Sequence, residues 1–301
     1  MQFEKIRQLM NEFAASTTAE VGLAFLDRET GLSHTVNGDK QIPACSMFKI
    51  WLLLALFKMA ERGQVSLEEE WPFAEGDKSR GSGILASLRP GFSMQLWNYV
   101  YLMMAHSDNS ATDKVLRFVT ADRVRKEVLK PLDLAGTTVE VSCQEMLDTA
   151  YSTANPDGEM QAPGLPSYRM TPFYLGKTAN NLTTPNDVLK TFSALLDGRI
   201  LNAEWTQKTV DLMSLCETNS RIPRLLPGKK RLKIAHKTGS CDRICNDGGI
   251  LFTKKGVYML VLMYNGNTAS EEEYIAGYAR YRPDNALAEL SKAIYDAYMT
   301  P

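Results

Sequence analysis

No long apolar run occurs in this sequence. The longest, residues 50–57, lies directly beside Lys49 and is far shorter than the roughly 20 residues that a helix needs to cross a bilayer. The N-terminal segment also lacks the apolar run and small-residue cleavage site of a signal peptide. We therefore expect no membrane partner. The protein is expected to be cytoplasmic if the chain is complete, and secreted or periplasmic if a signal peptide has been removed.

A surplus of charge of either sign is also missing. The chain has 34 Lys and Arg against 35 Asp and Glu, a net charge of −1, which gives no reason to expect a nucleic-acid partner. Of the 301 residues, 44% are hydrophobic and 23% charged, as is ordinary for one large globular domain or two interleaved ones. We expect a monomer.

Histidines and cysteines are too few and too scattered to suggest a metal centre. The three histidines are His34, His106 and His236. Neither they nor the five cysteines have the spacing of metal ligands. A metal hydrolase is therefore disfavoured, and we expect no cofactor. Because five is an odd number, at least one thiol stays unpaired within the chain.

The order of the predicted elements indicates an α+β fold. An amphipathic helix begins the chain and another closes it at 285–299. Strands are predicted at 21–26, 32–36, 232–238, 249–253 and 257–263, and helices between them at 47–62, 94–105, 110–119 and 184–196. We therefore expect an antiparallel sheet built from both termini, flanked by the terminal helices, with an all-helical insertion. Residues 1–44 and 214–301 would form the sheet subdomain and 45–213 the helical one, with the active site in the cleft between them.

Three short strings carry the residues most typical of chemistry. They are Ser46-Met47-Phe48-Lys49, Ser107-Asp108-Asn109 and Lys237-Thr238-Gly239. Ser46 stands where a helix is predicted to start, and Lys49 follows three residues later on the same face. A hydroxyl with a lysine one turn away suggests a nucleophile and its base, provided that burial or cationic neighbours lower the lysine pKa from ~10.4. Taken alone, each string is equally typical of a helix cap or a surface turn.

In this order, the three strings resemble the signature of class A serine β-lactamases and their penicillin-binding relatives. The resemblance covers most of residues 20–298. Its further segments are Gly81-Ser82-Gly83-Ile84-Leu85, Leu182-Thr183-Thr184-Pro185 and Arg221-Ile222-Pro223-Arg224. It implies a β-lactamase/transpeptidase-like fold and acyl transfer through an acyl-enzyme on a small-molecule substrate that bears a carboxylate.

The resemblance assigns catalytic roles to the first two strings. Ser46 is the nucleophile and Lys49 its base. The hydroxyl of Ser107 relays a proton to the leaving nitrogen, and the amide of Asn109 orients Lys49 or the substrate. Asp108 is expected to point away from the site and to hold its loop.

The third string is expected to bind substrate from an edge strand. Lys237 and Thr238 would contact the substrate carboxylate, and Gly239 would permit close backbone approach. The backbone N–H of Ser240, together with that of the nucleophile, is the predicted oxyanion hole. Arg221 is the candidate for an arginine with which some members help to hold the carboxylate.

Two cysteines flank the predicted site. Cys45 precedes the nucleophile and Cys241 lies two residues after Gly239, an arrangement that resembles class A enzymes with carbapenem-hydrolysing activity in which these positions form a disulfide. The resemblance implies that the two lie close together. An oxidising compartment would favour the bond, and a cytosolic protein would keep both thiols.

The pattern fails where class A enzymes carry Glu-x-x-Leu-Asn, the string whose glutamate activates the deacylating water. The nearest match is Gln144-Glu145-Met146-Leu147-Asp148, which puts a glutamine in the glutamate's position. Glutamine cannot accept a proton from water as a carboxylate does. Glu145 or Glu140 could substitute if the region 120–182, which we expect to be a long irregular loop, is rebuilt.

The missing glutamate makes acylation a firmer prediction than turnover. The leading interpretation is a β-lactamase-like serine hydrolase that acts on a β-lactam or a related amide or ester. One alternative is a penicillin-binding or sensor-type module that acylates without efficient turnover. Another is a peptidase or esterase with a non-lactam substrate.

Overall fold

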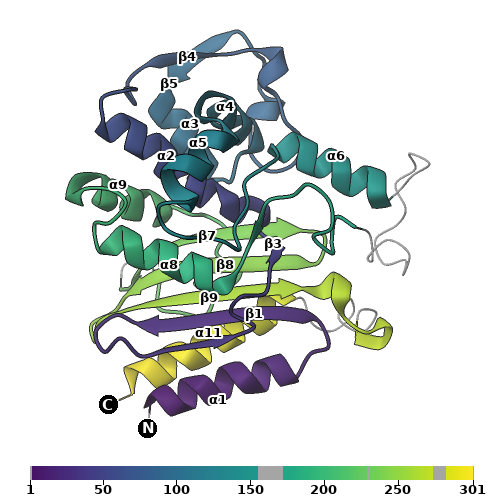
Figure 1. Ribbon diagram of the computed structural model, residues 1–301, viewed down its shortest axis with the longest axis vertical. Coiled ribbons are helices and arrows are strands. Elements are labelled where there is room, and N and C mark those ends of the chain that lie inside the picture. Colours follow the sequence, from purple (N-terminus) through teal and green to yellow (C-terminus); the bar gives the residue numbers. More distant parts are fainter. Residues whose placement is uncertain (1, 155–171, 229–230, 274–282, 301) are drawn as a thin grey trace.

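A single antiparallel sheet forms the lower half of the molecule in Figure 1. The computed structural model describes residues 2–154, 172–228, 231–273 and 283–300. Within these, the sheet has five strands in the order β2-β1-β9-β8-β7. The strands are β1 (Glu20–Asp27), β2 (Ser33–Val36), β7 (Lys233–Cys241), β8 (Ile244–Phe252) and β9 (Val257–Asn265). The predicted sheet built from both termini is confirmed, since β1 pairs with β9 along its whole length.

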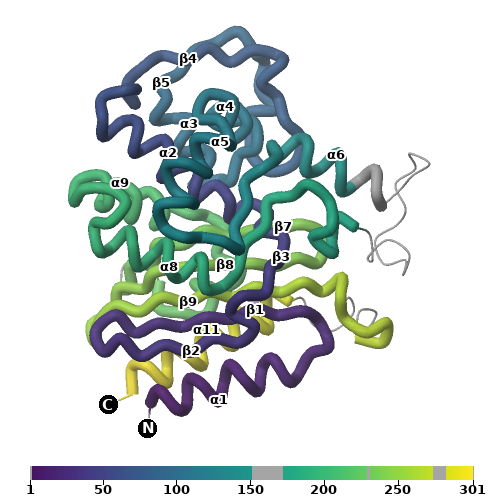
Figure 2. The backbone as a smooth tube through the Cα atoms, viewed as in Figure 1, coloured from purple at the N-terminus to yellow at the C-terminus, as the bar shows by residue number. Residues whose placement is uncertain are grey.

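Two terminal helices cover the outer face of the sheet. Helices α1 (Gln2–Ala15) and α11 (Pro283–Met299) lie side by side there, with the two chain ends close together (Figures 1 and 2). The apolar stripe of α1 buries Ile6 and Met10 against the sheet. Burying one such side chain stabilises the fold by about 1.5–3 kcal/mol. The amphipathic pattern of both helices therefore encodes their packing.

A helical layer lies on the opposite face of the sheet. Its central helix α2 (Lys49–Glu61) is buried on all sides over its first nine residues, as its uniformly apolar sequence requires. The elements around it are α3 (Leu96–Ala105), α4 (Asn109–Val119), α5 (Ala121–Val124), α6 (Cys143–Ala154), α8 (Pro185–Leu196) and α9 (Ala203–Met213). Helix α8 contacts both β1 and β9 and thereby joins the helical layer to the sheet. Its start is fixed by the cap hydrogen bond that the Thr184 hydroxyl accepts and by a proline at the first position.

Two predictions about local structure were wrong. The helix expected at 94–105 begins only at Leu96, because 92–95 form strand β5 (Phe92–Gln95) paired with β4 (Glu70–Phe73). The loop expected over 120–182 contains helix α6, which starts with a capping box: the Glu145 N–H donates to Ser142 Oγ, and the Ser142 N–H donates to the Glu145 carboxylate. Residues 155–171 of that region lie outside the described part of the chain.

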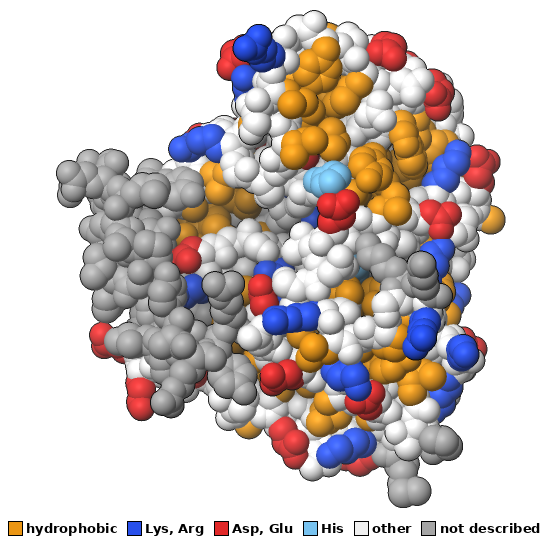
Figure 3. Space-filling view, turned by 180° about the vertical axis from the view of Figure 1, so that it is seen from behind, with side chains coloured by type: hydrophobic (Ala, Val, Ile, Leu, Met, Phe, Trp, Pro, Cys, Tyr) orange, Lys and Arg blue, Asp and Glu red, His pale blue; other side chains and the backbone are white. Residues whose placement is uncertain are grey.

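The surface shows no single dominant charge. In the space-filling view of Figure 3, Lys and Arg side chains alternate with Asp and Glu over the described part of the visible face, in keeping with the net charge of −1. None of the helices in the described ranges is both long and apolar enough to cross a bilayer.

Candidate active site

The three strings singled out in the sequence meet at the free edge of the sheet. Ser46 lies in a 3-10 turn, η1 (Cys45–Phe48), that leads into α2. Ser107, Asp108 and Asn109 connect α3 to α4, and Lys237 to Gly239 lie on the edge strand β7. Turn η1 packs directly against β7. Segments about 190 residues apart in the chain therefore form one site.

Lys49 is held by residues of the second string. Its side chain has no exposed surface. The Nζ atom donates to Ser107 O at 2.7 Å, to Ser107 Oγ at 3.1 Å and to Asn109 Oδ1 at 2.9 Å. Burial lowers the pKa of Lys49, although the Cys143 thiol and nearby carboxylates oppose the shift. A lowered lysine pKa is the condition under which we expected Lys49 to act as a base.

Ser107 links the second string to the third. Its Oγ accepts a hydrogen bond from Lys49 and a second one from Lys237 Nζ at 3.0 Å. Because two ammonium groups occupy the oxygen's acceptor sites, its own O–H is left free to donate elsewhere. Ser107 adopts a left-handed backbone conformation, φ 55°, that few side chains tolerate. The strain is consistent with a residue held for a function.

Asp108 holds the loop over the site, as expected. Its Oδ2 accepts from the N–H groups of Ile84 and Leu85, at 2.7 and 2.9 Å. Its Oδ1 accepts from the Ala111 N–H and caps helix α4. The carboxylate therefore ties residues 84–85 to the start of α4.

The side chain of the candidate nucleophile, Ser46, is not engaged by its neighbours in the described part of the chain. Ser46 is 8% exposed, and its Oγ makes no side-chain hydrogen bond with any described residue. The turn is strained just before it, since Cys45 has φ 47°. The Ser46 N–H is among the first N–H groups of the helix, which lack partners within it.

Gly239 brings β7 against this turn. A Cβ at position 239 would lie 2.2 Å from Ala44 O and 3.1 Å from Met47 Cγ. Only glycine fits so close to the backbone before the nucleophile. The close backbone approach predicted for Gly239 is therefore an approach to turn η1 of the same chain.

Strand register gives the direction of the Ser240 N–H. Cys241 and Ile244 close a two-residue hairpin loop, so they form a hydrogen-bonded pair, and the next pair, Ser240 with Cys245, is a non-hydrogen-bonded one. The N–H of Ser240 consequently points away from β8, to the free edge where η1 lies. This direction is the one that an oxyanion hole shared with Ser46 requires.

Lys237 and Thr238 line the same edge. Lys237 is fully buried and also donates to Thr238 O at 3.1 Å, which leaves one of its three N–H groups unassigned. Burial lowers the pKa of Lys237 to about 8; the Cys216 thiol raises it, and the Lys49 charge lowers it further. An incoming carboxylate would find a cation here in slightly acidic to neutral solution.

Arg221 lies behind β7 and is engaged with the protein itself. It is 3% exposed. Its guanidinium pairs with Asp284 at 2.6 Å and donates to Gly239 O, to Asn246 O and to Ser240 Oγ. The structure thus shows Arg221 supporting the strand, and its predicted contact with the substrate carboxylate stays a prediction.

Gln144 and Glu145 lie on α6 and are both engaged locally. Gln144 accepts from the Arg80 N–H at 2.9 Å and donates to Asp148 Oδ1 at 2.9 Å. Glu145 is exposed, and its carboxylate belongs to the capping box of α6. Within the described ranges, no Asp or Glu accepts a hydrogen bond from Lys49.

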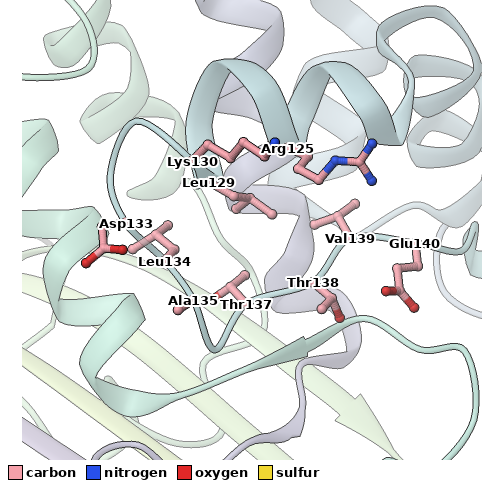
Figure 4. A pocket seen from close by; sticks show the side chains of 10 residues that line it. All are labelled: Arg125, Leu129, Lys130, Asp133, Leu134, Ala135, Thr137, Thr138, Val139 and Glu140. Carbon is pink, nitrogen blue, oxygen red and sulfur yellow. The ribbon is translucent and has the colours of Figure 1, made fainter.

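Glu140 faces a different part of the surface. It lines a cavity of about 320 Å³ between the π-helical turn Arg125–Leu129 and the irregular segment 133–140, together with Arg125 and Thr138 (Figure 4). All ten residues that line this cavity fall within 125–140. The cavity is therefore separate from the Ser46 site.

Cys45 and Cys241 lie together, as the resemblance implied. Both are free thiols and form a hydrogen bond with each other. That bond and burial raise the pKa of Cys45, while the same bond lowers that of Cys241. The predicted proximity is confirmed, and the disulfide itself stays a prediction.

Several residues that support the site had no recognisable signal in the sequence. Asp113 accepts from the N–H groups of Cys143 and Gln144, at 2.7 and 3.0 Å, and so anchors α6 to α4. Asn246 donates to Pro43 O at 2.9 Å and ties β8 to the segment before the nucleophile. His236 pairs with Asp247 at 2.9 Å behind Lys237. The first two contacts join residues at least 30 positions apart and the third joins neighbouring strands, so none forms a recognisable string.

Comparison with known proteins agrees with this geometry. The model described as the beta-lactamase enzyme family matches residues 3–298. Beta-lactamase CARB-4 of Pseudomonas aeruginosa is 22% identical over 207 residues, which are 69% of this chain and 63% of that protein. The match thus spans less than two thirds of that relative's own length.

Solved structures share the fold at low identity. A beta-lactamase from Sphaerobacter thermophilus DSM 20745 superposes with a TM-score of 0.79 at 23% identity, covering 99% of each chain. A single-residue mutant of PBP-A, solved as an acyl-enzyme complex with penicillin G, gives a TM-score of 0.76 at 21% identity over 98% of this chain and 96% of that one. At such identities the likeness establishes the fold.

Proposed function

Since this chain belongs to the beta-lactamase enzyme family, we propose that it is a serine hydrolase that forms an acyl-enzyme at Ser46 with a β-lactam or a related amide or ester. The site lies in the cleft between the helical residues 45–213 and the sheet. The observation that carries the proposal is the hydrogen-bonded chain from Lys49 through Ser107 to Lys237, which joins all three strings.

Lys49 is the base of the acylation step. Its neutral amine takes the proton from Ser46 Oγ as the new C–O bond forms, and the carbonyl electron pair moves onto the oxygen. The N–H groups of Ser46 and Ser240 stabilise that oxyanion. Asn109, which accepts from Lys49, keeps the amine in place.

Ser107 completes acylation. As the C–N bond breaks, the Ser107 O–H gives its proton to the leaving nitrogen, and Lys49 passes the proton that it took from Ser46 to Ser107 Oγ. Lys237 and Thr238 hold the substrate carboxylate, so that the carbonyl meets the nucleophile. Arg221 keeps β7 in place through Gly239 O and Ser240 Oγ.

Deacylation is the slow step of this proposal. Gln144 occupies the position at which the family's pattern has a glutamate, and its amide is bound to Arg80 and Asp148. Glu145 and Glu140 are directed elsewhere. Without a carboxylate that takes a proton from water, the acyl-enzyme has a long lifetime.

A second candidate function follows from the same observation. A penicillin-binding or sensor-type module needs a stable acyl-enzyme, which a site with Gln144 would provide. A mutant of PBP-A, a neighbour at a TM-score of 0.76, was solved as an acyl-enzyme complex with penicillin G. A peptidase or esterase on a non-lactam substrate would use the same Ser46 chemistry.

One experiment separates these functions. The protein is mixed with a chromogenic cephalosporin, and both colour and intact mass are followed. Steady colour indicates a β-lactamase, whereas one equivalent of colour with a lasting adduct indicates the penicillin-binding function. If neither colour nor an adduct appears, the peptidase or esterase interpretation remains.

The nucleophile is tested with a matched pair of variants. Ser46→Ala should abolish the adduct, and Ser93→Ala, at an exposed position on β5, should keep it. An adduct of unchanged stoichiometry on Ser46→Ala would overturn the assignment of the nucleophile.

A further inference from the structure

A buried chain of three titratable groups lies directly behind Lys237. His236 Nδ1 is 2.9 Å from Asp247 Oδ1, and Asp247 Oδ2 accepts from the Ile222 N–H at 3.1 Å. Cys216, which follows α9, faces the other side of the imidazole. The three side chains are at most 1% exposed. The acyl-transfer mechanism uses none of them.

The second ring nitrogen of His236 needs a partner that a neutral thiol does not supply. Nε2 is buried and makes no conventional hydrogen bond within the described part of the chain. The Cys216 thiol interacts with the His236 ring, and because Nδ1 is bound to Asp247, Nε2 is the ring nitrogen left for the sulfur. A buried polar nitrogen without a partner destabilises the folded state. An imidazolium N–H directed at a thiolate removes this cost, because the pair is charge-assisted.

Charge at the site also calls for an anion near Lys237. The ammonium groups of Lys49 and Lys237 share one acceptor, Ser107 Oγ, and Arg221 lies behind the same strand. Lys237 and Arg221 are two cations in one desolvated region, and Lys49 is a third whenever it is protonated, so they repel one another unless negative charge is close. Asp284 neutralises Arg221, so Lys237 needs an anion of its own.

We propose that Cys216 is a thiolate paired with the imidazolium of His236, and that the Cys216–His236–Asp247 chain positions the positive charge of Lys237 for carboxylate binding. The proton of the thiol moves from Sγ to Nε2, so the S–H bond breaks and an N–H bond forms. The transfer leaves the net charge of the chain unchanged and places a negative charge on Sγ. Cys216 acts through Lys237 and is a positioning residue.

The acid–base properties of the groups agree with this assignment. Burial raises the pKa of the Cys216 thiol, but the charge and hydrogen bond of His236 outweigh it and lower the pKa to about 7. Burial lowers the pKa of His236, but Asp247 and Cys216 raise it to about 10. The groups that face Lys237 are Cys216, Lys49, Asp247 and Arg221, and those that face Cys216 are His236, Lys237 and Asp247.

The sign of the effect on Lys237 follows from the thiolate charge. An anion close to a lysine favours its protonated form and raises its pKa. Removing the thiolate lowers the Lys237 pKa, so the lysine loses its charge at a lower pH. Binding of a carboxylate substrate then weakens in neutral solution, whereas the chemistry at Ser46 is unchanged.

The first test needs no substrate. Nitrogen NMR of the wild-type protein, labelled in histidine, should show both ring nitrogens of His236 protonated at neutral pH. The matched variant Cys216→Ser keeps the volume and removes the anion, and it should return His236 toward a neutral tautomer. A neutral His236 ring in the folded wild-type protein overturns the proposal.

The second test rests on the proposed function and uses penicillin G and its methyl ester as probes. With Cys216→Ser, the alkaline limit of penicillin G acylation should move down by about one pH unit, the lower end of what a lost opposite charge within ~4–6 Å produces. The weaker binding of penicillin G at alkaline pH should appear as a rise in KM. Acylation by the uncharged methyl ester should not change. Cys216→Asp, which carries a fixed anion, should restore the wild-type profile.

Controls distinguish failure of the proposed function from failure of the role proposed for Cys216. Cys245→Ser removes a thiol whose pKa burial raises to about 12, so it should leave the His236 signals unchanged. Absence of any acylation would refute the proposed function but leave the NMR result standing. Equal profiles for wild type, Cys216→Ser and Cys216→Asp would refute the role of Cys216 in positioning the charge.

Discussion

Lys49 and Lys237 donate hydrogen bonds to the same acceptor, Ser107 Oγ, at 3.1 and 3.0 Å. One lysine comes from the helix that follows the nucleophile and the other from the edge strand, so a single hydroxyl connects the base to the carboxylate-binding side of the site. Both lysines are fully buried, and burial lowers both pKa values. Under the proposed function, Lys49 loses its proton to act as a base, and Lys237 keeps its proton to bind an anion.

Replacing Lys49 should remove acylation without unfolding the protein. Lys49→Met keeps the volume of the buried chain and removes the base, so the acylation rate constant should fall about 10²–10⁴-fold. Intact mass against time measures it. Lys5→Met, at an exposed position on α1, is the control and should acylate at the wild-type rate. A Lys49→Met protein that acylates normally would mean that another group is the base.

Gly239 should tolerate no side chain. The Cβ of Gly239→Ala would lie 2.2 Å from Ala44 O, so β7 must move away from the nucleophile turn. We expect a loss of about 1–3 kcal/mol in the free energy of unfolding, together with slower acylation. Denaturant unfolding and acylation kinetics measure the two effects. Gly228→Ala meets nothing within 4 Å and should change neither.

A carboxylate at position 144 should convert slow turnover into steady turnover. Gln144 donates to Asp148, so Gln144→Glu alone would set two carboxylates against each other. The double variant Gln144→Glu/Asp148→Asn avoids this repulsion and should raise the deacylation rate constant by about 10²-fold or more. Decay of the acyl-enzyme mass measures it.

Glu145→Ala is the matched control for that experiment. It should destabilise α6 by about 0.5–2 kcal/mol through loss of the capping box and leave deacylation unchanged. If the double variant deacylates no faster than the wild type, water activation at this site does not depend on residue 144.

Acylation by a carboxylate substrate should have a bell-shaped pH profile. The rate rises as Lys49, whose pKa burial lowers, loses its proton and becomes a base. It falls as Lys237 loses its charge around its pKa of about 8. Second-order acylation rate constants between about pH 5 and pH 10 test this. A rate that still rises above pH 9 would show that Lys237 need not be charged.

Mild oxidation should join Cys45 to Cys241. The two thiols already form a hydrogen bond, so glutathione disulfide should produce an intramolecular bond, seen as the loss of two thiols by mass. The bond should raise the free energy of unfolding by about 2–4 kcal/mol. Cys45→Ser is the control and should form no such bond. Pairing of either thiol with Cys245 instead would contradict the expected geometry.

Much of the fold could be read from local patterns. Alternating apolar residues predicted β7, two apolar segments around the turn at 254–256 predicted β9 and the second half of β8, and the apolar stripe with Ile6 and Met10 predicted α1. The start of α3 could not be predicted, because residues 92–95 are held in β5 by pairing with β4. Helix α6 was not predicted, although the capping-box residues at 142–145 are present in the sequence. The prolines and glycines that follow them indicated a loop instead.

The sequence by itself predicted which residues carry the chemistry, because the three strings have a fixed composition and order. It also showed that the string Glu-x-x-Leu-Asn is absent. Only the tertiary structure decided that Ser107 joins Lys49 to Lys237, that Arg221 supports β7, and that Cys216 lies behind the site with His236. Each of these facts depends on a contact between segments far apart in the chain. Such contacts arise from strand register and helix packing, and no local string of residues encodes them.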